Sequence, residues 1–243
     1  MKNKKKNILI VGGTGFIGYH LVKRCLKKNF EVSCISTKLP IKKNLFSKVT
    51  YLTCDIRNKS KLKKKITNKF NYIVNLGGYV DHSKLKKTFS SHYNGCVNIA
   101  NIFKNKKLES FIQLGSGLEY GRKNSPQKEN IKCLPISNYG LAKYKSSKYL
   151  LNLHKINDFP CTILRLYQAY GPYQKINRLV PMVIQSCIKK KIFPCTKGNQ
   201  KRDFLYIDDL IDLIFKIFNN KNARGEIINV GSGKPIKIKR LIE

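Results

Sequence analysis

The chain has 243 residues, of which 42% are hydrophobic and 10% are aromatic. This composition supports a sizeable core and excludes a chain that is disordered throughout. The formal net charge is +36, but the lysines run along the whole chain instead of gathering in one tail, which speaks against a specific nucleic-acid partner. Such a charge does attract diphosphate groups. No apolar run approaches the roughly 18 residues of a membrane span, so we expect a cytoplasmic protein without a membrane partner.

The hydrophobic pattern predicts strands that alternate with helices. Strands are expected at 7–11, 30–35, 49–53, 72–76, 110–114, 161–166, 192–196 and 226–230. Helices are expected at 16–28, 59–69, 93–103, 139–153, 179–190 and 208–218, and residues 236–242 have the pattern of the beginning of another helix. This alternation indicates an α/β fold with a Rossmann-like, doubly wound parallel sheet.

The regular alternation changes after Gly171. We expect residues 1–171 and 204–230 to form an NAD(P)-binding Rossmann domain, and residues 172–203 and 231–243 to form a small substrate-binding lobe. The chain stops at Glu243, within the pattern of a beginning helix. We therefore expect the lobe to be truncated, with its C-terminal part missing.

The eight cysteines are spread singly along the chain, without a C-x-x-C pair. Disulfide scaffolds are short and dense in cysteine, and zinc sites pair their ligands closely, so neither class fits. We expect free thiols that are buried as small hydrophobic groups, and no metal site.

A glycine-rich loop, GGTGFIG at residues 12–18, directly follows the first predicted strand and opens the first helix. It contains the pattern G-x-G-x-x-G, in which glycines allow a tight turn and bring backbone N–H groups close to a pyrophosphate. This placement predicts a dinucleotide site. Its contacts are expected from Gly12, Gly15, Phe16, Ile17 and Gly18.

The end of the second predicted strand indicates which dinucleotide is preferred. An Asp or Glu there would bond the ribose 2′-OH of NAD, but the sequence has Ser36, Thr37 and Lys38. Hydroxyl groups and a cation suit a 2′-phosphate, which a carboxylate would repel. We therefore expect NAD or NADP as the cofactor, with NADP favoured and with Ser36 and Lys38 in contact with it. The alternative is that Lys38 is one more surface lysine.

Tyr139 and Lys143 stand four residues apart on one predicted helix, so both side chains lie on the same face. A free tyrosine has a pKa of about 10, and we expect the positive charges of Lys143 and of a nicotinamide to favour the phenolate. Tyr139 would then be an acid/base toward a sugar hydroxyl or ketone. Ser116 follows the strand at 110–114, at the edge where doubly wound sheets bind ligands. We expect its hydroxyl to bond the reacting oxygen and to share the transferred proton with Tyr139.

Nine segments in one order carry a resemblance: GGTGFIG (12–18), CDIRN (54–58), NLGG (75–78), Asn94-Gly95, GSGLEYG (115–121), YGLAK (139–143), LRLYQAYGP (164–172), RDFLYIDDL (202–210) and NVGSG (229–233). The set resembles the extended short-chain dehydrogenase/reductases of the NAD-dependent epimerase/dehydratase family, which act on nucleotide sugars. The resemblance implies a nucleotide-diphosphate sugar as the partner, and a homodimer.

The resemblance also implies roles for single residues. The catalytic group would be Ser116, Tyr139 and Lys143, of which Tyr139 and Lys143 would also contact the cofactor. Residues bordering the adenine or lining the cofactor would be Asp55, Ile56, Leu76, Gly77 and Gly78. Arg202 would meet the substrate diphosphate, while the nucleotide and sugar pocket would be shaped by Arg178, Val180 and Gln200.

One departure from the family narrows the reaction. Members that dehydrate carry Asp-Glu directly after the Ser or Thr, whereas this chain has Gly117 and Leu118, which can neither protonate a leaving hydroxyl nor remove a proton. A 4,6-dehydratase is therefore disfavoured. Glu119 lies one position further on and is included among the substrate-binding candidates, although strand alternation would point it away from Ser116 or place it behind the residues that touch the substrate.

Two reactions remain open, both of which move a hydride at a sugar carbinol or ketone carbon, expected at C4. A 4-epimerase returns the hydride to the other face and keeps its cofactor, whereas a 4-ketoreductase delivers it once and exchanges the cofactor. The alternative from another class is a non-catalytic dinucleotide-binding protein on the same fold. Such a protein would be expected to have lost Ser116, Tyr139 or Lys143, and all three are present.

Overall fold

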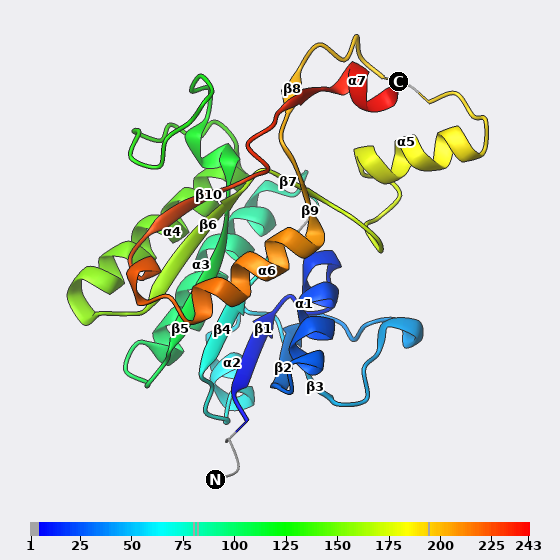
Figure 1. Ribbon diagram of the computed structural model, residues 1–243. Helices are drawn as coiled ribbons and strands as arrows, with labels where there is room; N and C mark the ends of the chain where they lie inside the picture. Colours follow the sequence, from blue (N-terminus) through cyan, green and yellow to red (C-terminus); the bar gives the residue numbers. More distant parts are fainter. Residues whose placement is uncertain (1–4, 80, 82, 194) are drawn as a thin grey trace.

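The computed structural model describes residues 5–79, 81, 83–193 and 195–243. Its centre is a seven-stranded sheet in the order β10-β6-β5-β4-β1-β2-β3, in which every neighbouring pair is parallel (Figure 1). The strands are β1 (Asn7–Val11), β2 (Glu31–Ser36), β3 (Val49–Thr53), β4 (Tyr72–Asn75), β5 (Ser110–Ser116), β6 (Cys161–Leu166) and β10 (Ile227–Val230). The strand order reverses between β1 and β4, which is where doubly wound sheets bind ligands.

Helices cover both faces of this sheet. The helices α1 (Phe16–Lys27) and α6 (Ile207–Phe218) pack on one face, and α2 (Lys59–Lys65), α3 (Leu85–Phe103) and α4 (Asn138–Asn157) pack on the other. Along β1, Ile8 and Ile10 join the core with α1 and α6, whereas Leu9 and Val11 join the core with the other three helices. A strand buried on both faces needs a continuous apolar run, and residues 7–11 supply it.

Smaller elements lie beyond the carboxyl ends of the main strands. The strand β8 (Lys201–Arg202) pairs antiparallel with β11 (Ile236–Lys237), and β7 (Gln168–Tyr170) pairs parallel with β9 (Phe204–Tyr206). The helices α5 (Leu179–Ile188) and α7 (Ile238–Ile242) lie at this end in Figure 1. Three short 3-10 helices complete the elements: η1 (Lys42–Asn44), η2 (Gly117–Tyr120) and η3 (Lys221–Ala223). The division into a Rossmann domain and a substrate lobe stays a prediction.

The predicted doubly wound parallel sheet is confirmed, and its strands begin and end within two residues of the predicted bounds. The strand predicted at 192–196 is wrong for the described residues of that range; Pro194 lies outside them, and Ile192 is fully exposed. The helix α3 begins at Leu85 instead of residue 93, because its first buried positions, Thr88 and Ser91, are polar and give no apolar pattern. The helix α2 ends at Lys65, short of the predicted residue 69.

All eight cysteines are free thiols. Six of them are buried, as predicted, but Cys187 on α5 and Cys195 in the segment after it are exposed, so the prediction of buried thiols is wrong for these two. In the described part of the chain, no helix has both the length and the apolar character needed to cross a membrane.

The packing of α6 on the sheet can be tested at Ile214, which is fully buried in the core shared with α1. Ile214→Ala leaves a cavity, so we expect the free energy of unfolding to fall by about 2–5 kcal/mol. Ile156 on α4 is 69% exposed, and Ile156→Ala is the matched control, with an expected change within about 0.5 kcal/mol. Urea titrations followed by circular dichroism give both free energies of unfolding. Equal losses in the two variants would contradict the burial of Ile214 between α6 and the sheet.

Candidate functional site

Ser116 is the last residue of β5 and is followed at once by η2. Its side chain accepts a hydrogen bond from Leu118 N at 3.2 Å, and its own N–H donates to Glu119 Oε1 at 2.9 Å. This reciprocal pair is a capping box, which satisfies backbone donors at the start of a helical turn. The arrangement holds the Ser116 side chain at the carboxyl edge of the sheet.

Tyr139 reaches the same edge from the first turn of α4. This helix begins at Asn138, and the Ser137 side chain caps it by accepting from Gly140 N at 3.0 Å. A Cβ at Gly140 would lie 3.2 Å from the carbonyl carbon of Leu118, so the glycine lets the start of α4 lie close against η2. The close approach brings Tyr139 near the Ser116 side chain, which is among the groups that act on the pKa of its phenol.

Lys143 lies one turn further along α4 and is buried. Its ammonium donates to the carbonyl oxygen of Leu114 on β5 at 2.6 Å, and Nζ is 5.7 Å from the centre of the Tyr139 ring. Burial lowers the pKa of Lys143 to about 8, although the Glu119 carboxylate and the Cys96 thiol raise it. The structure therefore brings Ser116, Tyr139 and Lys143 together, as the sequence predicts.

The pKa of Tyr139 departs from its ordinary value in the direction opposite to our expectation. Burial raises it to about 12, the hydrogen bond with Ser116 lowers it, the Glu119 charge raises it and the Arg178 charge lowers it. The expectation that Lys143 depresses this pKa is wrong for the protein by itself, because the ammonium points to the Leu114 carbonyl and desolvation dominates. Tyr139 is a phenol, and hence a proton donor, at neutral pH.

The predicted cofactor loop surrounds the start of α1. Gly15 is the N-cap residue, exposed and without a side-chain cap, and the first turn of α1 contains no acidic residue. A Cβ at Gly18 would lie only 2.6 Å from Gly13 Cα, so the helix packs directly on the loop. Open backbone N–H groups at a helix N-terminus fit a pyrophosphate. The half-buried side chains of Phe16 and Ile17 pack against the α1 core.

Further predicted cofactor residues follow β4 and β3 at the same edge. Leu76, Gly77 and Gly78 come directly after β4, and a Cβ at Gly77 would lie 3.2 Å from Ile56 Cδ1. Asp55 and Ile56 come two and three residues after the end of β3. The segments that the sequence assigns to the adenine and to the rest of the cofactor are thus neighbours.

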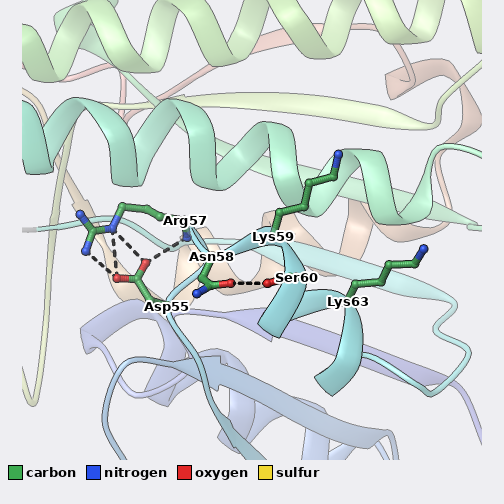
Figure 2. Close-up of a pocket in the computed structure, with 6 residues that line it drawn as sticks. All are labelled: Asp55, Arg57, Asn58, Lys59, Ser60 and Lys63. Carbon is green, nitrogen blue, oxygen red and sulfur yellow. Dashed lines mark hydrogen bonds and ion pairs between the residues drawn. The ribbon is translucent and has the colours of Figure 1, made fainter.

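Asp55 also lines an open pocket of about 840 Å³ beside α2, with Arg57, Asn58, Lys59, Ser60 and Lys63 (Figure 2). Figure 2 shows the Arg57 guanidinium against the Asp55 carboxylate, with Nη2 at 2.6 Å from Oδ2. Hydrogen bonds from Arg57 lower the pKa of Asp55, in spite of partial burial. Arg57 was not predicted as a site residue; its position two residues after Asp55 was the signal that could have identified it.

Ser36, the expected contact for the ribose, is the last residue of β2. Its hydroxyl oxygen is buried and has no hydrogen-bond partner among the described residues. Cys54 N donates to the Ser36 carbonyl at 2.9 Å, which places the end of β2 beside the segment that holds Asp55. Lys38 is exposed two residues beyond Ser36.

The predicted substrate residues separate into two groups. Gln200 and Arg202 line one pocket of about 220 Å³, together with Gln168, Leu179, Met182, Cys195, Thr196, Phe204 and Ile238. Arg178 is the N-cap residue of α5, and its charge acts on Tyr139. Val180 follows in the first turn of α5 and is half-buried, but it does not line this pocket.

Glu119 is placed differently from its predicted role in substrate binding. It is fully buried, and its Oε2 accepts hydrogen bonds from Ser147 Oγ at 2.9 Å and from Arg165 Nε at 3.0 Å. Its Oε1 accepts from the backbone of Ser116. Because both oxygens are engaged by the protein and no part of the side chain is exposed, a direct contact with substrate does not fit this geometry.

Two residues near Tyr139 were missed. The His92 ring lies edge-on to the Tyr139 ring, with centroids 4.8 Å apart, and Arg165 forms the buried ion pair with Glu119. His92 lies in the polar first half of α3, and Arg165 interrupts an apolar strand. Arg165 could have been found from the sequence, because a charged residue within an apolar, fully buried strand needs a buried partner.

The low pKa of Lys143 gives a stability test. Its ordinary pKa is 10.5 and its value in the protein is about 8, so folding releases a proton between these pH values and wild-type stability rises there. We expect Lys143→Met to be more stable than the wild type by up to roughly 3 kcal/mol near pH 6.5, and we expect this advantage to vanish by about pH 10.5.

Urea unfolding of the wild type and of Lys143→Met over this pH range measures the difference. Lys148→Met, on an exposed position of the same helix, is the control and should show no comparable pH dependence. A difference between Lys143→Met and wild type that stays constant with pH would contradict a buried, titrating ammonium.

The chain is similar to known proteins in family, sequence and structure. The model of the NAD dependent epimerase/dehydratase family matches residues 8–231. The dTDP-4-dehydro-6-deoxyglucose reductase of Escherichia coli is 27% identical over 260 residues, which cover 100% of this chain and 82% of that protein.

Two solved structures have the same fold. The UDP-glucuronic acid 4-epimerase of Bacillus cereus, in complex with UDP-glucuronic acid and NAD, is 28% identical with a TM-score of 0.82, covering 96% of this chain and 80% of that one. The UDP-N-acetylglucosamine 4-epimerase of Methanobrevibacter ruminantium, in complex with UDP-N-acetylmuramic acid, is 25% identical with a TM-score of 0.88. The match covers 99% of this chain and 81% of that one. With the family model matching nearly all of its length, this chain belongs to the NAD-dependent epimerase/dehydratase family.

Proposed function

We propose that the chain is an NAD(P)-dependent enzyme that transfers a hydride at C4 of a nucleotide-diphosphate sugar, as a 4-ketoreductase or a 4-epimerase. The observation that carries the proposal is the placement of Tyr139 at the carboxyl edge of the sheet, where the Ser116 hydroxyl acts on its phenol and Lys143 Nζ is 5.7 Å from the centre of its ring. Two hydroxyls held together there can both reach one oxygen of a bound sugar. The glycine loop before α1 opens at the same edge.

In the reductive direction Tyr139 is the acid. Burial keeps its phenol protonated, and the Ser116 hydroxyl can bond both to Tyr139 and to the sugar oxygen that gains negative charge. NAD(P), when bound at the glycine loop, would supply or accept the hydride. Arg178 places positive charge near the phenol, which stabilises the phenolate left after proton transfer.

The two reactions are favoured by different observations. A ketoreductase is supported by the lack of an acidic residue at position 36 and by the similarity to the Escherichia coli reductase. A 4-epimerase is supported by the similarity to the two 4-epimerase structures. Arg202 in the smaller pocket suits the substrate diphosphate, since a guanidinium binds phosphate oxygens in a bidentate manner.

Dehydration is disfavoured by the space beside Ser116 as well as by the residue types. A Cβ at Gly117 would lie 2.8 Å from Cε1 of Tyr167, so the tyrosine ring occupies the volume that an acidic side chain would need. Tyr167 is held there by a hydrogen bond from its hydroxyl to Gln127 Oε1 at 2.9 Å. Leu118 is 54% exposed and has no acid or base function.

The deciding experiment incubates the protein with UDP-, dTDP-, CDP- and GDP-hexoses and with their 4-keto forms, with and without NADPH or NADH. Net consumption of reduced cofactor marks a ketoreductase, whereas isomer formation without net cofactor change marks an epimerase. Cofactor binding without turnover of any sugar would favour the non-catalytic dinucleotide-binding alternative.

Tyr139→Phe tests the acid/base directly, because it removes the phenolic hydroxyl and keeps the ring against His92. We expect turnover to fall by about 10²- to 10⁴-fold, while cofactor affinity stays within about twofold. Tyr144→Phe, on the same helix, is the control and should retain wild-type turnover. A Tyr139→Phe variant that keeps a large share of wild-type activity would refute the assignment.

Cofactor choice is tested at Ser36. Ser36→Asp should raise the ratio of the NADPH to the NADH dissociation constant by at least about tenfold, because a carboxylate repels the 2′-phosphate and accepts a bond from the 2′-OH. Ser36→Asn has the same size without the charge and should change the ratio much less. Fluorescence titrations with both cofactors measure the ratio, and an unchanged ratio in Ser36→Asp argues against this residue as the ribose contact.

A further inference from the structure

Glu119 is a carboxylate in the interior of the protein, and its ion-pair partner, Arg165 on β6, is buried as well. Burying two charges costs several kcal/mol for each ion, and an apolar pair of similar volume is often as stable or more stable. Stability alone therefore gives no reason for an ion pair at this place. The pair lies directly behind Ser116, which suggests a role in the reaction.

The Glu119 carboxylate connects three elements that build the site. Oε1 accepts from Ser116 N at 2.9 Å, where β5 passes into η2. Oε2 accepts from Ser147 Oγ on α4 at 2.9 Å and from Arg165 Nε on β6 at 3.0 Å. Ser147 lies one turn after Lys143, and its Oγ is also 3.1 Å from the Lys143 carbonyl oxygen. One side chain thus fixes Ser116 relative to the helix that carries Tyr139 and Lys143.

Glu119 also supplies the negative charge that acts on Lys143. Burial lowers the pKa of Lys143 to about 8, the Glu119 carboxylate raises it, and the Cys96 thiol of α3 raises it further. On its other sides, Lys143 faces the Leu114 carbonyl of β5 and the ring of Tyr139. Without the Glu119 charge, desolvation would leave a larger fraction of Lys143 neutral at physiological pH.

Tyr139 experiences the same charge among other groups. Burial raises its pKa, the Ser116 hydroxyl lowers it, Glu119 raises it and Arg178 lowers it. The His92 ring of α3 packs edge-on against it. Glu119 therefore favours the protonated form of both Tyr139 and Lys143.

We propose that Glu119, anchored by Arg165, is a positioning residue of the reaction proposed above: it fixes the backbone of Ser116 and keeps Lys143 cationic. The inference rests on that proposed function for its catalytic meaning. A cationic Lys143 donates to the Leu114 carbonyl at 2.6 Å and so holds α4, which carries Tyr139, against the strand that ends at Ser116. Glu119 acts from inside the protein, without touching substrate or cofactor.

The test measures the ionisation of Lys143 directly, by NMR titration of protein labelled with ¹³Cε-lysine, with Lys143→Met identifying the resonance. Glu119→Gln keeps an oxygen for Ser116 N and removes the charge. We expect the Lys143 midpoint to shift down by about one pH unit, which is a tenfold loss of the cationic form above the midpoint. Glu129→Gln is the matched control, since the Glu129 side chain is exposed and accepts from Asn229 N, away from Lys143.

Glu119→Gln leaves Arg165 as a buried charge without its partner, which endangers folding. The double variant Glu119→Gln/Arg165→Met removes the pair together and should fold. Arg165 donates to Glu119 and to the Glu129 carbonyl, whereas Lys143 donates to the Leu114 carbonyl, so we expect the double variant to show a downward shift as well. An unchanged Lys143 midpoint in the double variant, or in Glu119→Gln, would overturn the proposal.

The pH dependence of kcat then tests whether the shift of the Lys143 midpoint affects the reaction. In Glu119→Gln, we expect the decline of kcat with rising pH to begin about one pH unit lower than in the wild type. KM should stay within about twofold of the wild-type value. A uniform loss of kcat at every pH, without displacement of this limb, would show a structural role only and would also overturn the proposal. If the wild type turns over no nucleotide sugar, the proposed function fails, while the NMR midpoints still decide whether Glu119 keeps Lys143 charged.

Discussion

Parallel pairing of the central strands is the constraint on which the site depends. Since all seven strands run in one direction, the segments that follow β1, β3, β4 and β5 emerge at a common edge. The glycine loop, Asp55, Leu76 and Ser116 meet there although they are distant in sequence. Tyr139 does not follow a strand, and it reaches the edge because α4 begins against η2, with Gly140 beside the Leu118 backbone. The reactive pair thus depends on one tight helix contact in addition to the sheet.

Much of this arrangement follows from pattern alone, and the exceptions have physical reasons. Apolar runs mark strands that are buried on both faces, and the glycine loop and the Tyr139–Lys143 spacing mark the edge where chemistry is possible. The first half of α3 was missed because the side chains it buries, such as Thr88 and His92, are polar. The partners of Glu119 could not be predicted, because Arg165 and Ser147 come from β6 and α4 and meet it only in the folded chain.

Positive charge serves two different purposes in this protein. Most of the net charge of +36 is carried by exposed lysines, which water and salt screen and which act on a diphosphate only as a general attraction. Lys143 is the opposite case, because it is withdrawn from water and its ionisation depends on the few groups that surround it. Lysine is so frequent in this sequence that composition does not identify Lys143, the residue whose surroundings lower its pKa. Its spacing from Tyr139 is the feature that distinguishes it.

The contact between Gly117 and the Tyr167 ring constrains how this protein could change over evolution. In a relative that eliminates water, an acidic side chain stands directly after the serine or threonine, but here the ring fills that volume. An acidic substitution at position 117 alone would clash, and a smaller residue at position 167 alone would leave a void and release Gln127 from its hydrogen bond. An acidic residue at position 117 therefore requires the Tyr167 ring to move, which couples these two positions.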